Sequence, residues 1–428
     1  MSNGDEILNA LAHGFLAEFG NAVLCHHQVR QVPRNGDNGP RVQRGDDAGE
    51  SALFGGGALG EDGPAAFHTE QIGTSMAHLI DCGAVTNRYK AIDKGITAEI
   101  KPNGTAQVQL YSIDYKASCS FGLEEKDAPQ ELWARYVFGV CREILKRGGV
   151  VKGFDAVFAG DVPLGAGLSS SAALESCFAF GLNDLFENGF DLFELARIGQ
   201  NTEHNYCGVK CGIMDQFASC FGRKGQLIRL DCKTLEHKYY PFDPVGYKVV
   251  LADSCVKHSL ASSAYNLRRE SCERATEAIQ KRHPEIECLS DCKRVWLEEV
   301  RGNISEEDFM RAEYVIGEVQ RVLDVCDALE RRDYETVGEM MYQTHFGLSR
   351  LYEVSCEELD FLNRIARRTD VTGSRVMGGG FGGCTINLVR EELYEGFVRR
   401  ATEEFLAKFG HAPKFYDVVV SDGARRID

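Results

Sequence analysis

The sequence lacks the long apolar segment that a membrane-spanning protein needs. No uninterrupted apolar stretch approaches the roughly 20 residues that an α-helix needs to cross a bilayer. The opening residues, MSNGDEILNALAHGF, have neither a basic region nor a long apolar core, so we expect no secretory signal. Positive charge is also in deficit, because 48 Lys and Arg face 64 Asp and Glu and leave a net charge of −16. This balance argues against nucleic acids and anionic membranes as partners.

Cysteine motifs that bind metals are missing as well. The chain has 16 cysteines, yet no two of them form a C-x-x-C pair. Cys207 and Cys211 are four residues apart, as are Cys288 and Cys292, but no histidines stand nearby at zinc-finger spacing. We therefore expect free thiols in a reducing cytoplasm, rather than a disulfide framework or a zinc site.

The remaining composition is that of an ordinary globular protein. Hydrophobic residues make up 43% of the 428 residues, which is enough for two domains or one large two-lobed body. Internal repeats are absent, and strand-like and helix-like segments are mixed rather than regularly alternating. We therefore predict an α+β fold, with an N-terminal lobe over residues 1–245 and a C-terminal lobe over residues 246–428.

Local patterns predict the elements of this fold. Apolar residues in short β-type runs predict strands at residues 96–100, 108–113, 226–230, 248–252, 384–389 and 415–420. Apolar residues at helical spacing predict helices at residues 5–19, 133–147, 193–206, 275–282, 306–329, 334–346 and 393–409. Residues 21–90 show neither pattern and are rich in Gly, Asp, Gln and Arg, so we expect a long loop or a disordered segment there.

The most informative segment is PLGAGLSSSAALE, at residues 163–175. Its glycines, Gly165 and Gly167, allow the backbone to turn tightly and to approach a ligand closely. Three serines follow, and an apolar segment at residues 172–185 continues the run. The start of a helix offers free N–H groups and a partial positive charge, both of which favour phosphate. This segment therefore predicts a phosphate-binding loop that opens a helix.

Other phosphate-binding motifs fit less well. A Walker A loop requires lysine where Ala166 stands, and a dinucleotide fingerprint requires glycine where Ser170 stands. Gly378, Gly380 and Gly383 do fit G-x-G-x-x-G, but a strand rather than a helix is expected to follow them. A protein kinase would carry D-F-G and H-R-D, and both are absent.

Taken together, these segments resemble the GHMP kinases, the family of galactokinase, homoserine kinase, mevalonate kinase and phosphomevalonate kinase. PLGAGLSSSAALE resembles the second, ATP-binding motif of the family, and GSRVMGGGFGGCTINLV, at residues 373–389, resembles the third. EHNYCGVKCGIMDQFAS, at residues 203–219, is similar to the stretch with the catalytic carboxylate. VKHSLASSAYNLRR, at residues 256–269, resembles the sugar-side segment of the galactokinases. The resemblance runs from about Ala91 to the C-terminus.

The resemblance implies a fold and an activity. The expected fold is the two-lobed GHMP kinase fold, with an N-terminal lobe like domain 2 of ribosomal protein S5 and a ferredoxin-like C-terminal lobe. The expected activity is ATP-dependent phosphorylation of the C1 hydroxyl of galactose. ATP is then the co-substrate, Mg²⁺ the metal, galactose or a related sugar the partner, and a cytoplasmic monomer the default state.

The resemblance also assigns roles to individual residues. Ser171 and Glu203 match the metal-binding serine and glutamate of the family. Asp215 matches the catalytic aspartate that accepts the proton of the sugar hydroxyl, and it counts with Tyr265 among the substrate-binding residues. The ATP-binding loop consists of Gly165, Ala166, Gly167, Leu168, Ser169, Ser170 and Ser171.

From the residues alone, each of these positions also has a plainer structural interpretation. The glycine-serine run fits a turn that caps a helix. Asp215 fits a helix N-cap, and Glu203 fits a solvated carboxylate at a helix end. Tyr265 fits an ordinary half-buried tyrosine. The surrounding motifs favour the functional interpretation of Asp215.

One part of the family pattern is absent. The first motif, of the form GRxNLIGEHTDY, supplies an arginine near the transferred phosphate and the groups that read the sugar hydroxyls, and residues 21–90 stand where it belongs. We hypothesise that this stretch comes from a shifted reading frame or a mis-assembled gene. Translation of its DNA in every frame tests the hypothesis, which fails if no frame yields an NLIGEH-like string.

The missing motif keeps alternatives open. Loss of a cation that stabilises the transition state lowers the rate of phosphoryl transfer by ~10³-fold or more. A non-catalytic ATP-binding sugar sensor or an inactive relative is one alternative. A kinase for a related sugar, such as N-acetylgalactosamine or arabinose, is another, since the first motif carries much of the sugar specificity.

Overall fold

The computed structural model describes residues 94–162, 169–209, 211–256 and 261–425. The expected helix at residues 5–19 and the aperiodic stretch at residues 21–90 lie outside these ranges. Gly165, Ala166, Gly167 and Leu168 of the ATP-binding loop lie outside them too.

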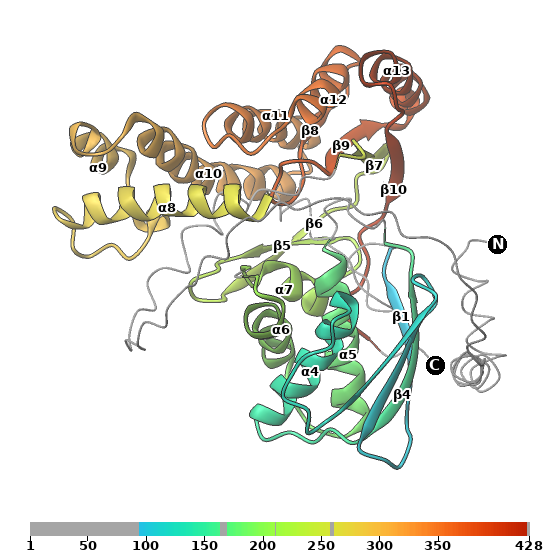
Figure 1. Ribbon diagram of the computed structural model, residues 1–428. Coiled ribbons are helices and arrows are strands. Elements are labelled where there is room, and N and C mark those ends of the chain that lie inside the picture. The colour runs from blue at the N-terminus through green and yellow to red at the C-terminus, as the bar shows by residue number, and fades with distance from the viewer. Residues whose placement is uncertain (1–93, 163–168, 210, 257–260, 426–428) are drawn as a thin grey trace, which may run out of the picture.

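The N-terminal half is built on one mixed sheet. Its strand order is β1-β4-β2-β3, with β1 and β4 antiparallel, β2 and β3 antiparallel, and β2 and β4 parallel. The strands are β1 Ile96–Pro102, β2 Gln107–Ser112, β3 Ala117–Gly122 and β4 Phe154–Gly160. The helices are α4 Leu132–Lys146, α5 Ser170–Leu185, α6 Leu192–Thr202 and α7 Met214–Phe221. They gather on one side of the sheet, where they bury their apolar residues (Figure 1).

The start of α6 shows how sequence sets a helix boundary in this half. Asp191 accepts a hydrogen bond from the backbone N–H of Glu194 at 2.9 Å, and the Glu194 carboxylate accepts one from the N–H of Asp191 at 2.9 Å. This reciprocal pair satisfies two N–H groups that the first turn leaves without helical partners. The predicted helix at residues 193–206 is confirmed in its extent: α6 ends at Thr202, and a π-helix, η2, continues it at Glu203–Cys207.

The C-terminal half contains a second four-stranded sheet in the described residues, with the order β10-β7-β9-β8 and all pairs antiparallel. Its strands are β7 Tyr247–Asp253, β8 Gly373–Val376, β9 Cys384–Arg390 and β10 Lys414–Val418. Helices α12, Glu357–Arg368, and α13, Glu391–Phe409, share a core with this sheet. A small hairpin joins the halves and consists of β5 Gln226–Leu230 and β6 His237–Pro241.

Four helices extend from this sheet to one side (Figure 1). They are α8 Ala261–Gln280, α9 Arg294–Glu299, α10 Glu306–Glu330 and α11 Tyr334–Arg350, with short 3₁₀ turns η3 Leu289–Asp291 and η4 Arg301–Asn303. The prediction for residues 275–282 captured only the end of α8. Residues 261–274 are rich in polar side chains and show no apolar stripe, so periodicity missed the helix start.

One hydrophobic core runs through both halves. It joins Phe138 and Phe178 of the N-terminal helices to Leu251 of β7 and Leu388 of β9. Backbone hydrogen bonds also cross between the halves, because Gly423 N–H donates to Gly222 O and Ala424 N–H donates to Ser219 O, each at 2.8 Å. The two sheets are therefore parts of one packed body, and the α+β prediction is confirmed.

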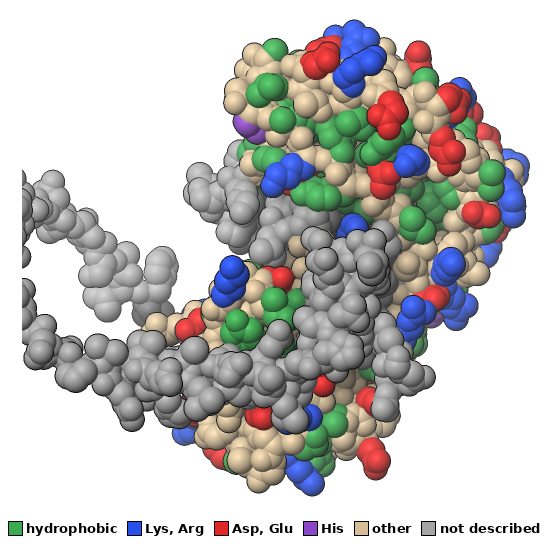
Figure 2. All heavy atoms as spheres, turned by 90° about the vertical axis from the view of Figure 1, so that its right-hand side faces the viewer, with side chains coloured by type: hydrophobic (Ala, Val, Ile, Leu, Met, Phe, Trp, Pro, Cys, Tyr) green, Lys and Arg blue, Asp and Glu red, His purple; other side chains and the backbone are tan. Residues whose placement is uncertain are grey.

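The surface shows no single-sign field on the face drawn in Figure 2, where the described acidic and basic side chains are interspersed. Among the described helices, none has the length and apolar character that crossing a membrane requires.

Close contact between α11 and β8 gives a stability prediction. A methyl group added at Gly338 of α11 would overlap the backbone of Thr372, whereas one added at Gly317 of α10 would meet no atom within 4 Å. We expect Gly338→Ala to lower the free energy of unfolding by about 2 kcal/mol through overpacking. Gly317→Ala should raise it by about 0.5–1 kcal/mol through helix propensity. Urea unfolding of both variants measures the two changes in the free energy of unfolding. Equal changes in the two variants would contradict the prediction.

Candidate active site

The start of α5 meets the start of α7. Ser169 precedes α5 in the left-handed conformation, with φ of 43°, and its side chain does not cap the helix. Its hydroxyl donates instead to Oδ2 of Asp215 at 2.6 Å. The N–H groups of the first turn of α5 are therefore not satisfied by the Ser169 hydroxyl, which suits a helix start that binds phosphate.

Asp215 lies in the first turn of α7, where the N-cap position is Ile213. The N-cap interpretation of Asp215 is therefore wrong. Its neighbours Met214, Gln216 and Phe217 are buried, while Asp215 itself remains partly accessible. A partly accessible carboxylate held by a hydroxyl is in a suitable position to accept a proton from a substrate.

Glu203 opens the π-helix beside this pair. Its side chain is buried, with 5% of the residue exposed, so the interpretation as a solvated carboxylate is wrong. The pKa of Glu203 is raised to about 7, mainly by burial. A hydrogen bond from Ser171 lowers the pKa in part, and the negative charge of Asp215 adds to the rise. The fold thus places Ser171, Glu203 and Asp215 in one site.

Three further residues of this site were not identified from the sequence. Glu175 of α5 is fully buried, and its Oε2 accepts a hydrogen bond from Gln216 Nε2 at 3.1 Å. Burial, and then the charge of Glu203, raise the pKa of Glu175 well above its ordinary value. Tyr136 of α4 interacts with Ser171, and burial followed by the charge of Glu203 raises its pKa. A carboxylate within the apolar run AALESCFAF was the sequence signal for Glu175.

The third glycine-rich segment forms the loop between β8 and β9. Gly378, Gly380 and Gly383 have φ values of 66°, 78° and 75°, a region that favours glycine. A Cβ at Gly380 would also overlap the carbonyl of Val354, whose oxygen accepts a hydrogen bond from Phe381 N at 2.6 Å. The strand that follows is β9, as the sequence predicted, so the loop does not open a helix.

The structure describes the backbone position of Tyr265 and the state of most cysteines. Tyr265 lies near the start of α8, and its side chain is outside the described part. Every cysteine that the structure describes is a free thiol. Cys207 lies near the carboxylates, and burial followed by the charge of Glu203 raises its pKa to about 12. Within the described ranges, no three His, Cys, Asp or Glu side chains gather as a metal-binding group.

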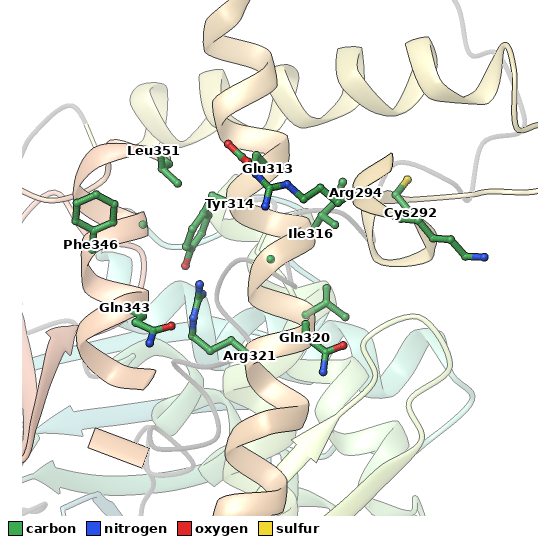
Figure 3. Close-up of a pocket in the computed structure, with 14 residues that line it drawn as sticks. Cys292, Arg294, Glu313, Tyr314, Ile316, Gln320, Arg321, Gln343, Phe346 and Leu351 are labelled. Atoms are coloured by element: carbon green, nitrogen blue, oxygen red, sulfur yellow. Dashed lines mark hydrogen bonds and ion pairs between the residues drawn. The ribbon is translucent and has the colours of Figure 1, made fainter. Parts of the chain in front are cut away.

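A cavity of about 580 Å³ lies away from these residues, between α10 and α11. Figure 3 shows Tyr314, Arg321 and Gln343 pointing toward one another there, with Phe346 at one end. It contains none of the predicted site residues, so the candidate active site remains at the start of α5.

Comparison with known proteins identifies the family of the chain. Residues 135–223 match the family model for the GHMP kinases N terminal domain, and residues 326–408 match that for the GHMP kinases C terminal. The galactokinase of Clostridium acetobutylicum is 36% identical over 367 residues, which cover 84% of this chain and 91% of that protein. The chain belongs to the GHMP kinases. Ser171, Glu203 and Asp215 all lie in the matched N-terminal domain.

Other members of the GHMP kinases agree with this assignment. The galactokinase of Thermosipho africanus is 39% identical over 296 residues, covering 69% of this chain and 82% of that protein. The crystal structure of Lactococcus lactis galactokinase complexed with galactose has a TM-score of 0.75 and 30% identity, over 82% of this chain and 91% of that one. A mevalonate kinase structure, at a TM-score of 0.52 and 17% identity over 78% of this chain and 91% of that one, shares the fold. The predicted GHMP kinase fold is confirmed.

The raised pKa of Glu203 predicts a pH-dependent stability. Between about pH 4.5 and 7, the folded state holds a proton on Glu203 that the unfolded state releases, so stability falls as pH rises. We compare the free energy of unfolding of Glu203→Gln with that of the parent protein, in the absence of divalent metal. From pH 4 to pH 8, this difference should shift by about 3 kcal/mol in favour of Glu203→Gln. Urea unfolding with EDTA measures this difference, and a constant difference at both pH values would contradict it.

Proposed function

We propose that this protein is a galactokinase, an ATP-dependent kinase that transfers the γ-phosphoryl group of ATP to the C1 hydroxyl of galactose. The observation that carries the proposal is the 2.6 Å hydrogen bond from Ser169, at the start of α5, to Asp215. It brings a helix start suited to phosphate and a carboxylate suited to a hydroxyl into direct contact. The similarity to galactokinases supports galactose as the sugar.

The reaction follows from this geometry. The ATP-binding loop, residues 165–171, would surround the phosphates, with the start of α5 directed at them. Asp215 would accept the proton of the C1 hydroxyl as that oxygen bonds to the γ-phosphorus, and the bond to the β-phosphate oxygen would break to release ADP. The Ser169 hydroxyl orients the Asp215 carboxylate for this transfer. Positioning and electrostatics supply most of the catalysis in such reactions.

The donor set of the site fits Mg²⁺. Ser171 and Glu203 offer a hydroxyl and a carboxylate, and Mg²⁺ prefers oxygen ligands while keeping water and substrate phosphates as its other ligands. When bound, the ion would neutralise charge on the transferred phosphate. Its positive charge would also favour the ionised form of Glu203, which burial disfavours.

The sugar side of the site rests on Tyr265 and on the start of α8. We propose that Tyr265 contacts the sugar, as its match to the galactokinase segment implies. We also propose that the chain acts as a cytoplasmic monomer, with lobes at residues 1–245 and 246–428. The non-catalytic alternative has less support, because Ser169, Glu203 and Asp215 are present and gathered in one place.

Galactose-dependent formation of ADP from Mg·ATP tests the proposal. Asp215→Asn keeps the shape of the side chain but removes the base, so we expect turnover to fall at least ~100-fold while ATP binding persists. N-acetylgalactosamine and arabinose, tested in parallel, should be poorer substrates than galactose. ADP formation that needs no sugar, or that survives Asp215→Asn unchanged, would contradict the proposal.

The metal assignment gives a separate prediction. Because Glu203 must lose its proton to bind Mg²⁺, the Mg²⁺ concentration needed for half-maximal binding of a fluorescent ATP analogue should fall as pH rises from 6 to 8. Glu203→Gln should reduce this pH dependence to that of the terminal phosphate of the nucleotide, which also titrates in this range, and should raise the Mg²⁺ requirement. A requirement that is unchanged in Glu203→Gln would assign the metal to other ligands.

A further inference from the structure

A second polar contact joins α5 to α7, directly beside the first. Glu175 accepts a hydrogen bond from Gln216, which is the residue after Asp215. The two side chains are buried, with exposed fractions of 0% for Glu175 and 1% for Gln216. Consecutive residues of α7 are therefore bonded to neighbouring parts of one segment, Asp215 to Ser169 just before α5 and Gln216 to Glu175 within α5.

Helix α6 packs against the Glu175–Gln216 pair. A Cβ at Gly199 would lie 2.8 Å from Cγ of Gln216 and 3.3 Å from Oε2 of Glu175. The backbone of α6 therefore approaches both side chains closely, and a residue larger than glycine at position 199 would displace Gln216. The contact thus sits where α5, α6 and α7 meet (Figure 1).

Burial of this pair is costly, which indicates a role other than simple packing. A buried carboxyl group loses its hydration, and an apolar pair of similar volume would hold two helices together without that cost. In the described part of the chain, Glu175 Oε1 and Gln216 Oε1 have no hydrogen-bond partner. A neutral carboxylic acid has one O–H to donate, and Gln216 Oε1 is an acceptor of the kind that it needs.

We propose that the Glu175–Gln216 pair is a positioning device for Asp215. The buried side chains of α7, among them Phe217, already set its general position in the core. Hydrogen bonds from two consecutive residues, Asp215 and Gln216, fix the rotation of the helix about its axis more tightly than one bond would. Asp215 is then held against the Ser169 hydroxyl at the start of the ATP-binding helix. The role in catalysis rests on the proposed function, while the effect on α7 does not.

Three substitutions test this role. Glu175→Met and Gln216→Met keep the volume and remove the bond, whereas Glu175→Gln keeps a side chain that accepts from Gln216 and can also donate to it. We expect the two Met variants to lose at least tenfold in kcat, with KM for galactose and for Mg·ATP within threefold. Glu175→Gln should stay within threefold of the parent protein in every constant.

A buried carboxylate in the other half of the chain provides the matched control. Glu318 of α10 is fully buried, accepts a hydrogen bond from Thr344 Oγ1 at 2.9 Å and forms an ion pair with Arg321. It makes none of the contacts that join α5 to α7. Glu318→Met should lose stability as the other Met variants do, yet keep kcat within threefold at a temperature where all variants are folded. An equal loss of kcat in this control would overturn the positioning role.

Amide hydrogen exchange gives a readout that does not depend on turnover. Exchange in residues 214–219 should speed up at least tenfold in Glu175→Met and Gln216→Met, but not in Glu175→Gln or Glu318→Met. Unchanged exchange in the first two variants, or a Glu175→Gln variant as impaired as Glu175→Met, would overturn the inference. Absence of galactose-dependent turnover in the parent protein would instead contradict the proposed function, and exchange alone would then decide the inference.

Discussion

The hydrogen bond between Ser169 and Asp215 is the contact on which the candidate site depends. It joins residues 46 positions apart, and everything between them serves to bring the two helix starts together. Helix α5 runs away from the contact, α6 returns, and the π-helix then redirects the chain into α7. Without this return, the start of α5, where we propose that phosphate binds, would lie apart from the carboxylate of α7.

The same arrangement concentrates negative charge in a poorly hydrated place. Glu175, Glu203 and Asp215 lie close enough for their charges to affect one another, and burial adds to the effect. Proteins relieve such crowding by holding protons or by binding cations. Here the raised pKa values of Glu175 and Glu203 show the first response, and a metal ion at Ser171 and Glu203 would supply the second. This crowding is consistent with the Mg²⁺ site that we propose.

Much of the site could be predicted from the sequence, because its signals are local. Glycines next to serines indicated a helix start that binds phosphate, and α5 begins at Ser170. The hairpin strand at residues 226–230 and the strand after Gly383 were also predictable from runs of β-type apolar residues. The family resemblance then placed Glu203 and Asp215 on a single stretch of chain.

What the sequence did not reveal depends on contacts between distant residues. Glu175 becomes important only because α7 brings Gln216 against it, and nothing local to either residue signals that bond. The π-helix has no periodic pattern of its own, so the sequence predicts a single helix at residues 193–206 and does not show where the helix type changes. The start of α8 lacks an apolar stripe, so its polar residues did not suggest a helix. Tertiary packing overrode local preference at each of these places.

The backbone bonds at residues 423 and 424 bear on how the chain folds. These hydrogen bonds go to Ser219 and Gly222 at the C-terminal end of α7. Nearby, Lys224 N–H donates to Asp422 Oδ1, which lies 198 positions later in the sequence. A ribosome adds roughly 5–20 residues per second, so these partners emerge at least about ten seconds after α7 itself. The helix that carries Asp215 therefore forms its last contacts only after residues 422–424 have been synthesised. The end of α7 therefore completes its contacts late, in spite of its early place in the chain.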